Sequence, residues 1–251
     1  MFDTRQTGLS ITHGPFSGHP KSNVALHVFN AFREKGLMVG AYFSKPDWHS
    51  EYYWWPAYAT PDRNNNYDIR KYKWRWRQFQ NFTFSQISEL MTDYGQIDIL
   101  WLDGGWVRPL ETVTDEVRGW GARIPEWSQD IGMEKIATMA RSKQPGILIV
   151  DRTVHGKHEN YLTPEQNIPK KKIEYPWESC ITLGNAWSYV PDDKFKSSRK
   201  VIHTLAEIAA KGGSLLLGVG PHPDGTFSEE KVGWLKEIGS WLKSNGAAIY
   251  N

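Results

Sequence analysis

The pattern of hydrophobic and polar positions is clearest in residues 97–102, an almost continuous apolar run that predicts a strand. Gly95 precedes this run and Gly104-Gly105 closes it, as is typical of a strand buried on both faces of a parallel sheet. Asp103 stands at the C-terminal end of the predicted strand. Similar apolar segments predict four further strands, at residues 37–43, 147–151, 177–182 and 214–219.

Helices are predicted between these strands from apolar residues at helical spacing. Within residues 22–35, Val24, Val28 and Phe32 follow this spacing, with Ser22 as the expected N-cap and Gly36 as the expected stop. The other predicted helices cover residues 74–94, 127–141, 197–211 and 228–244. Helices that alternate with buried strands indicate a parallel α/β fold.

The number of strands leaves two α/β architectures open. A closed (β/α)8 barrel needs eight strands, whereas an open doubly wound sheet would accept the five that the pattern predicts. However, no glycine-rich phosphate loop follows the first predicted strand, so a nucleotide site is not indicated. The 251 residues fit one large domain, without an internal repeat or a linker.

Three segments are predicted to be irregular. Residues 1–21 are rich in Gly, Pro, Ser and Thr, so the chain is expected to begin without a strand. Residues 51–72 and 153–176 are too long to be simple connections, and loops of that length are often lids or binding loops. The aromatic content of residues 51–72 argues against disorder there.

Composition adds few constraints on function. A net charge of +2 with mixed signs gives no argument for a nucleic-acid or membrane partner. No apolar run reaches membrane length, and the first ten residues do not resemble a signal peptide. Cys180 is the only cysteine, which excludes an internal disulfide. The 13 tryptophans and 11 tyrosines suit either a carbohydrate-binding surface or an aromatic core.

Asp103 is the first candidate for catalysis. In parallel α/β enzymes the residues at the C-terminal ends of strands face the bound ligand, so a carboxylate there is a catalytic candidate. The alternative is that Asp103 only caps the turn at Gly104-Gly105. Trp101 and Trp106 flank the carboxylate, and aromatic faces suit the apolar face of a sugar ring, which favours catalysis.

Several short motifs then follow one another in an informative order. Trp101-Leu102-Asp103-Gly104 resembles the nucleophile motif of the α-L-fucosidases of glycoside hydrolase family 29, and Tyr161-Leu162-Thr163-Pro164-Glu165 resembles their acid/base segment. Further resemblances are Met1-Phe2-Asp3-Thr4, Gly40-Ala41-Tyr42-Phe43-Ser44, Asp151-Arg152, Trp177-Glu178, and Lys211-Gly212-Gly213 with Leu215-Leu216-Leu217 and Gly220-Pro221. Gly218 departs from the family, which often has Asn at this position.

The resemblance implies a (β/α)8 TIM-type barrel. In the family about three strands precede the point that matches Met1, and a β-sandwich usually follows the barrel. Residues 1–251 are therefore expected to form a partial catalytic barrel domain, with roughly the first three strands missing and without the C-terminal β-sandwich.

The resemblance also implies a retaining glycosidase that hydrolyses α-L-fucosyl linkages. In such enzymes two carboxyl groups about 5 to 5.5 Å apart act as nucleophile and acid/base. Asp103 would attack the anomeric carbon, and Glu165 would protonate the leaving oxygen. From the residues alone, Thr163-Pro164-Glu165-Gln166 also fits an N-cap and capping box at a helix start. Glu178 is the alternative acid/base.

Four more residues are implied to bind the sugar. Trp101 and Trp187 would line the pocket around its apolar face, Tyr42 would hydrogen-bond a hydroxyl, and Arg152 would bind near the reacting centre. Each has an ordinary structural alternative: the aromatic side chains could be core residues, and Arg152 could pair with Asp151 or another acid.

No metal or other cofactor is expected. His49, His155 and His158 do not match a usual zinc spacing, and the implied mechanism needs no metal. The expected partner is a fucosylated oligosaccharide or glycoconjugate, and no nucleic acid or membrane. The resemblance suggests export, to a periplasmic, extracellular or lysosome-like compartment, although the chain shows no signal peptide.

Two alternatives to an active fucosidase stay open. The chain could be an inactive fragment or a carbohydrate-binding pseudoenzyme of the family, able to self-associate through an incomplete barrel. It could also be a glycosidase on a similar barrel with another sugar specificity.

Overall fold

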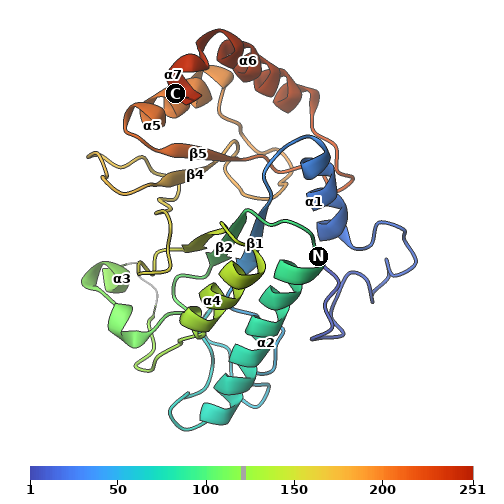
Figure 1. The fold of residues 1–251 in the computed structure, drawn as a ribbon, viewed down its shortest axis with the longest axis vertical. Coiled ribbons are helices and arrows are strands. Elements are labelled where there is room, and N and C mark those ends of the chain that lie inside the picture. Colours follow the sequence, from blue (N-terminus) through green and yellow to red (C-terminus); the bar gives the residue numbers. More distant parts are fainter. Residues whose placement is uncertain (120–122, 251) are drawn as a thin grey trace. The chain divides into compact units, whose positions relative to one another are not determined.

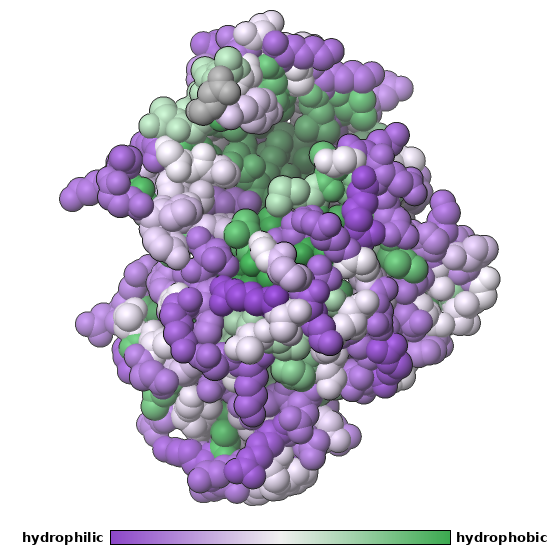
Figure 2. All heavy atoms as spheres, viewed as in Figure 1, coloured by the Kyte–Doolittle hydropathy of each residue, from purple (hydrophilic) through white to green (hydrophobic). Residues whose placement is uncertain are grey.

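The computed structural model describes residues 1–119 and 123–250 of the chain (Figure 1). The chain divides into two compact units, Met1–Asn160 and Tyr161–Asn251, and each unit is described by itself. Figure 2 shows hydrophilic residues over most of the visible face of the first unit. Among the described residues, no helix is both long and apolar enough to cross a membrane.

The first unit contains three parallel strands in the order β1-β2-β3. They are β1 (Gly40–Ser44), β2 (Ile99–Asp103) and β3 (Leu148–Asp151). The register places Tyr42 of β1 beside Trp101 of β2. All three predicted strands are confirmed, but the first was predicted too long, because the predicted start at residue 37 is exposed and pairing begins at Gly40.

The described residues of the first unit also form four helices and a 3-10 turn: α1 (Val24–Glu34), α2 (Lys73–Asp93), η1 (Leu110–Thr112), α3 (Asp115–Gly119) and α4 (Met133–Lys143). The N-cap of α1 is Asn23, whose side chain accepts from the Leu26 amide, and not Ser22 as predicted. Helix α4 was predicted from residue 127 but begins after Gly132, whose φ of 78° is left-handed and interrupts the helical path.

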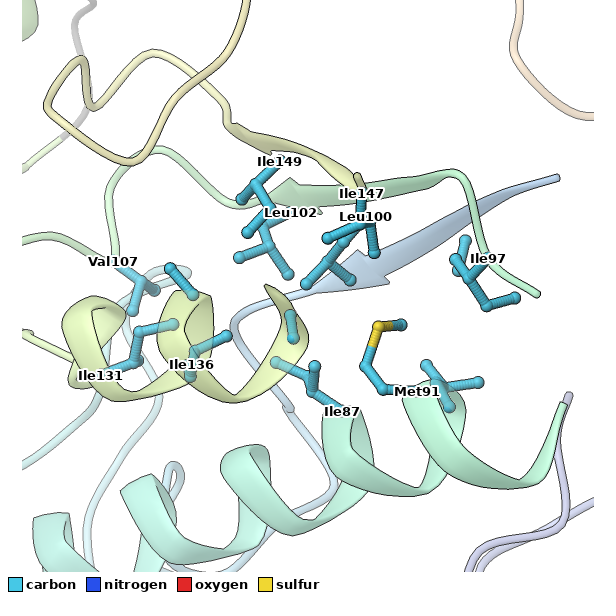
Figure 3. Close-up of a cluster of buried hydrophobic side chains, with 14 of the residues drawn as sticks. Ile87, Met91, Ile97, Leu100, Leu102, Val107, Ile131, Ile136, Ile147 and Ile149 are labelled. Atoms are coloured by element: carbon cyan, nitrogen blue, oxygen red, sulfur yellow. The ribbon is translucent and has the colours of Figure 1, made fainter. Parts of the chain in front are cut away.

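The core of the first unit lies between the sheet and helices α2 and α4, which pack side by side (Figures 1 and 3). Figure 3 shows Leu100 and Leu102 of β2 pointing toward Ile87 of α2 and Ile136 of α4. Trp101, on the other face of β2, is only partly buried. The prediction that this strand is buried on both faces was therefore wrong, because Ile99, Trp101 and Asp103 on this second face are only partly buried.

Residues 51–72 contain no helix or strand, yet much of this loop is packed. Tyr53 and Tyr67 are buried in the core cluster of the first unit. The buried Asn65 amide donates to Gln129 Oε1, and Asn64 accepts from Gln129 Nε2. A large part of the aromatic composition therefore serves packing, and the loop is ordered as its aromatic content predicted.

The second unit is built on two parallel strands, β4 (Glu178–Thr182) and β5 (Ser214–Gly218). Its helices are α5 (Ser198–Ala210), α6 (Glu229–Asn245) and the short α7 (Ala247–Tyr250). Ser197 and Ser228 cap α5 and α6 by accepting from amides three residues later, which confirms both predicted helix starts. The buried apolar residues form two small clusters, one around Trp177 and Ile208 and one around Leu183 and Ile238.

Residues 161–166 run beside β4 rather than starting a helix. Single parallel bridges join Leu162 to Trp177 and Glu165 to Cys180. The alternative interpretation of residues 163–166 as a capping box was therefore wrong: Gln166 has a φ of 50°, and its amide donates to the Cys180 carbonyl. Pairing with β4 therefore overrides the helix-start signal in the sequence of residues 163–166.

Candidate active site

Asp103 is held at the C-terminal end of the middle strand of the first unit. Its Oδ2 accepts a hydrogen bond from the Tyr42 hydroxyl at 2.7 Å. Its Oδ1 accepts from Arg152 Nη1 at 2.9 Å, which is also an ion pair. Asp103 ends β2, Tyr42 lies in β1, and Arg152 directly follows β3, so all three strands of the sheet contribute to this arrangement.

The surroundings of Asp103 favour the ionised carboxylate. Partial burial works against ionisation, but hydrogen bonds from Tyr42 and from the Gly104 backbone N–H, together with the Arg152 charge, outweigh it. The pKa of the Asp103 carboxyl is therefore held below its usual range. Burial and the neighbouring carboxylate raise the pKa of Tyr42, which keeps its hydroxyl a donor. An ionised carboxylate is the form that can act as a nucleophile.

Trp101 contacts both partners of Asp103, Tyr42 and Arg152. Its ring stacks on Tyr42 with centroids 5.6 Å apart and an interplanar angle of 21°. The Arg152 guanidinium lies over the same indole, 5.6 Å from the ring centroid. The structure thus brings together four of the predicted site residues, Tyr42, Trp101, Asp103 and Arg152, and Arg152 pairs with Asp103 rather than with Asp151.

The two glycines after Asp103 are required by close packing. A Cβ on Gly104 would lie 2.4 Å from Pro46 Cδ, and the Gly104 φ is 91°. A Cβ on Gly105 would lie 1.9 Å from Thr153 Oγ1. The Asp-Gly-Gly sequence therefore lets the loops that follow all three strands converge around the carboxylate, which goes beyond ordinary turn chemistry.

A buried ion pair fixes the same end of the sheet, and the sequence analysis did not find it. Lys45 is 1% exposed, and its Nζ lies 2.6 Å from Asp151 Oδ1. The Lys45 amide also donates to the Asp103 carbonyl. The available signal was that Lys45 comes shortly after the predicted strand 37–43, while Asp151 ends the predicted strand 147–151.

Arg108 is a second buried cation that the sequence analysis missed. Its guanidinium donates to the carbonyls of Gly105, Thr112 and Thr153. Thr153 has a φ of 62°, and it directly follows Arg152. Arg108 thus ties the loop after β2 to the loop after β3.

A pocket of about 600 Å³ opens beside Asp103 within the first unit. Tyr42, Asp103, Trp48, His49 and Trp106 are among its lining residues. Trp106 is held in place by hydrogen bonds from its Nε1 to the Tyr53 hydroxyl and the Arg63 carbonyl. The carboxylate is therefore accessible to a ligand of sugar size.

In the second unit, Glu165 and Trp187 lie together. Trp187 Nε1 donates to Glu165 Oε1 at 3.1 Å. Both residues are exposed, and both lie in loops. Glu178, the alternative acid/base, is the first residue of β4, so it stands at the opposite end of that strand from Thr182.

The three histidines considered for metal binding have different surroundings. His155 pairs with Glu159, and the Glu159 hydrogen bond raises the pKa of His155. His158 Nε2 lies 3.1 Å from Glu134 Oε2, and His49 lines the pocket. Within residues 1–119 and 123–250, no group of three or more His, Cys, Asp or Glu side chains is arranged to hold a metal ion.

Comparison with known proteins shows the family of this chain. The family model described as alpha-L-fucosidase matches residues 1–247. The chain belongs to the alpha-L-fucosidase family. An alpha-L-fucosidase of Dictyostelium discoideum is 23% identical over 238 residues, covering 92% of this chain and 46% of that protein. The human plasma alpha-L-fucosidase is 25% identical over 240 residues, covering 92% of this chain and 45% of that protein.

Solved structures of the alpha-L-fucosidase family share the fold. Isoenzyme 1 from Paenibacillus thiaminolyticus has a TM-score of 0.78 and 28% identity, covering 99% of this chain and 58% of that chain. A Bacteroides thetaiotaomicron family 29 fucosidase, trapped as a covalent intermediate, has a TM-score of 0.75 and 22% identity, covering 99% of this chain and 55% of that chain. The chain thus spans about half the length of these relatives.

Proposed function

We propose that this chain carries the catalytic centre of a retaining α-L-fucosidase, with Asp103 as the nucleophile. The observation that carries the proposal is the Asp103 carboxylate, fixed at the C-terminal end of β2 by the Tyr42 hydroxyl and Arg152 beside an open pocket. The substrate is a fucosylated oligosaccharide or glycoconjugate. No metal or other cofactor takes part.

In the first step Asp103 attacks the anomeric carbon as the bond to the leaving oxygen breaks. The leaving oxygen takes a proton from Glu165, so the products are a fucosyl ester on Asp103 and a free alcohol. In the second step Glu165 takes a proton from water, and the resulting hydroxide equivalent displaces Asp103. The anomeric configuration is retained because it is inverted twice.

Arg152 and Tyr42 serve the nucleophile directly. The Arg152 charge and the Tyr42 hydrogen bond stabilise the carboxylate, both before attack and when it leaves the ester. Trp101 and Trp187 offer indole faces to the apolar side of the sugar.

Glu165 is preferred to Glu178 as the acid/base for a structural reason. Ligands of parallel sheets bind at the C-terminal ends of strands. Glu178 begins β4, at the other end. Glu165 contacts Trp187, one of the residues assigned to the sugar pocket.

The five strands are proposed to be five of the eight strands of a (β/α)8 catalytic barrel, so that residues 1–251 form a partial catalytic barrel domain. The parallel pairing within each unit and the likeness to family 29 fucosidases support this assignment.

The test is release of nitrophenol from nitrophenyl α-L-fucoside by the chain. We expect turnover that falls at least about 10⁴-fold in Asp103→Asn, since removal of a nucleophile commonly costs this much. Asp224→Asn, at an exposed turn, is the matched control and should keep full activity. Inhibition by a fucose-shaped but not a galactose-shaped iminosugar separates this function from another sugar specificity.

If neither the chain nor its control turns over the fucoside, catalysis by this chain is ruled out. Binding of fucose without turnover would then favour the alternative, a carbohydrate-binding pseudoenzyme or inactive fragment.

A further inference from the structure

We propose that Gly218 is a positioning residue: it makes room for the Trp187 indole, which in turn orients the Glu165 carboxyl. The proposal concerns only the second unit. It rests on the proposed function insofar as Glu165 is assigned the acid/base role.

The steric evidence lies at the end of β5. A Cβ on Gly218 would lie 2.9 Å from both Cε3 and Cζ3 of Trp187. Real side chains do not approach so closely, so any residue larger than glycine displaces this ring. The Trp187 side chain is 46% exposed, so we expect displacement of its ring to be easier than distortion of the strand.

The backbone of the loop that contains Trp187 also packs closely against a second glycine, Gly220. A Cβ on Gly220 would lie 3.0 Å from the Ser188 carbonyl carbon and 3.2 Å from the Tyr189 amide nitrogen. The buried Lys231 donates to the Gly220 carbonyl at 2.9 Å, so this end of β5 is itself anchored. The loop that carries Trp187 therefore packs closely on two glycines, Gly218 and Gly220, of an anchored segment.

The anchoring of Glu165 is equally local. Its backbone bridges to Cys180 of β4, and the neighbouring Gln166 Nε2 donates to Thr182 Oγ1. Thr182 is paired with Gly218 in the β4–β5 register. The carboxyl and its indole donor are thus placed by two adjacent strands of one small sheet.

This contact has a chemical consequence. A donated hydrogen bond favours the ionised form of a carboxyl and fixes the direction in which its oxygens point. Glu165 must be protonated in the first step and ionised in the second, so the Trp187 donor bears on both its orientation and its pH range.

The test reads the contact directly, without requiring turnover. In the ¹⁵N-labelled full chain, the Trp187 indole N–H resonance, assigned by its loss in Trp187→Phe, should shift with pH as Glu165 ionises. The shift should vanish in Glu165→Gln and in Gly218→Ala, while the urea midpoint of Gly218→Ala stays close to that of the parent.

The matched control is Gly239→Ala in α6, where an added Cβ meets no atom within 4 Å. It should leave the indole titration unchanged. If Gly218→Ala titrates like the parent, or if the parent indole does not follow Glu165 at all, the proposal is overturned.

Kinetics then add the functional consequence. Gly218→Ala and Trp187→Phe should each lower kcat/KM about three- to tenfold, as expected for an exposed hydrogen bond to a charged group, and should move the alkaline limb upward in pH. The double variant should lose no more than either single one. An intact indole titration in a chain that hydrolyses no fucoside would reject the proposed function and leave the positioning contact standing.

Discussion

The two units hold their candidate carboxyl groups in different ways. Asp103 ends the middle strand of a three-stranded sheet and is bound by Tyr42 and Arg152 from the two flanking strands. Glu165 lies in an irregular segment with one backbone bridge, and its carboxyl meets the indole of an exposed loop tryptophan. The proposed nucleophile is therefore fixed by the sheet itself, whereas the proposed acid/base is placed by local contacts that include one loop tryptophan.

This difference separates two kinds of substitution. Around Asp103, the residues that shape the site also hold the sheet together, so changes there should cost stability and activity together. Around Glu165, the contacts are exposed, so changes should alter activity and its pH range with little effect on stability.

The largest expected effect is at the buried ion pair beneath Asp103. Lys45→Met leaves the Asp151 carboxylate without its Lys45 partner, so the free energy of unfolding should fall by about 3–5 kcal/mol. Urea unfolding followed by tryptophan fluorescence measures it. Lys211→Met, which removes the half-exposed pair with Glu207, is the control and should cost less than about 1 kcal/mol. Equal losses would contradict the contrast between the units.

The next effect concerns the turn after Asp103. Gly104→Ala places a Cβ against Pro46 at a left-handed φ. The combined strain and overpacking should lower the free energy of unfolding by about 2–4 kcal/mol. Gly146→Ala has a similar φ of 87° with nothing within 4 Å, so it should cost only about 1–2 kcal/mol. The difference between their urea midpoints measures the clash alone, and its absence would refute the close packing at Pro46.

A smaller effect is expected at Tyr42. Tyr42→Phe removes a hydrogen bond to a charged group worth about 1.5–3 kcal/mol, so kcat/KM should fall about 10- to 100-fold. The pKa of Asp103 should rise toward its usual value, which moves the acid limb of the pH profile upward. Tyr58→Phe, on an exposed tyrosine, is the control, and an unmoved acid limb in Tyr42→Phe would argue against this role.

The same carboxyl carries a pH dependence of stability. Because the folded-state pKa of Asp103 is lowered, its contribution is present above the unfolded pKa and is lost as the pH falls through the folded pKa. The loss on acidification should be smaller in Tyr42→Phe, as measured by urea unfolding at a series of pH values.

The smallest effect is at His155, whose pKa is raised by Glu159. The His155 side chain is 60% exposed, so solvent screening limits the pair to a few tenths of a kcal/mol, roughly. A raised folded-state pKa gives stability that is present below the unfolded pKa and lost as the pH rises through the folded one. His155→Asn, which tolerates the φ of 53°, should therefore destabilise the chain slightly near pH 5 and not at pH 9.

The same contrast explains what could be predicted from sequence. The apolar strand pattern placed β2 and β3 to within two residues, and strand ends in a parallel sheet meet, so Tyr42, Asp103 and Arg152 could be expected to converge. The resemblance to family 29 supplied their roles.

Features set by long-range packing could not be predicted. The pairing of Lys45 with Asp151 joins residues 106 positions apart, and the local pattern indicates only that each charge lies near the end of a strand. The Thr163–Gln166 sequence carried a helix signal that pairing with β4 overrode. The contact between Gly218 and Trp187 depends on a loop conformation, for which periodicity gives no signal.

The measurement that tests the account most directly is covalent labelling of the proposed nucleophile. The chain is incubated with 2-fluoro-fucosyl fluoride, digested, and mapped by mass spectrometry. The account predicts one fluorofucosyl ester, on the peptide that contains Asp103, and none in Asp103→Asn. A label on any other carboxyl group, or a label that persists in Asp103→Asn, would contradict the assignment of Asp103 as the nucleophile.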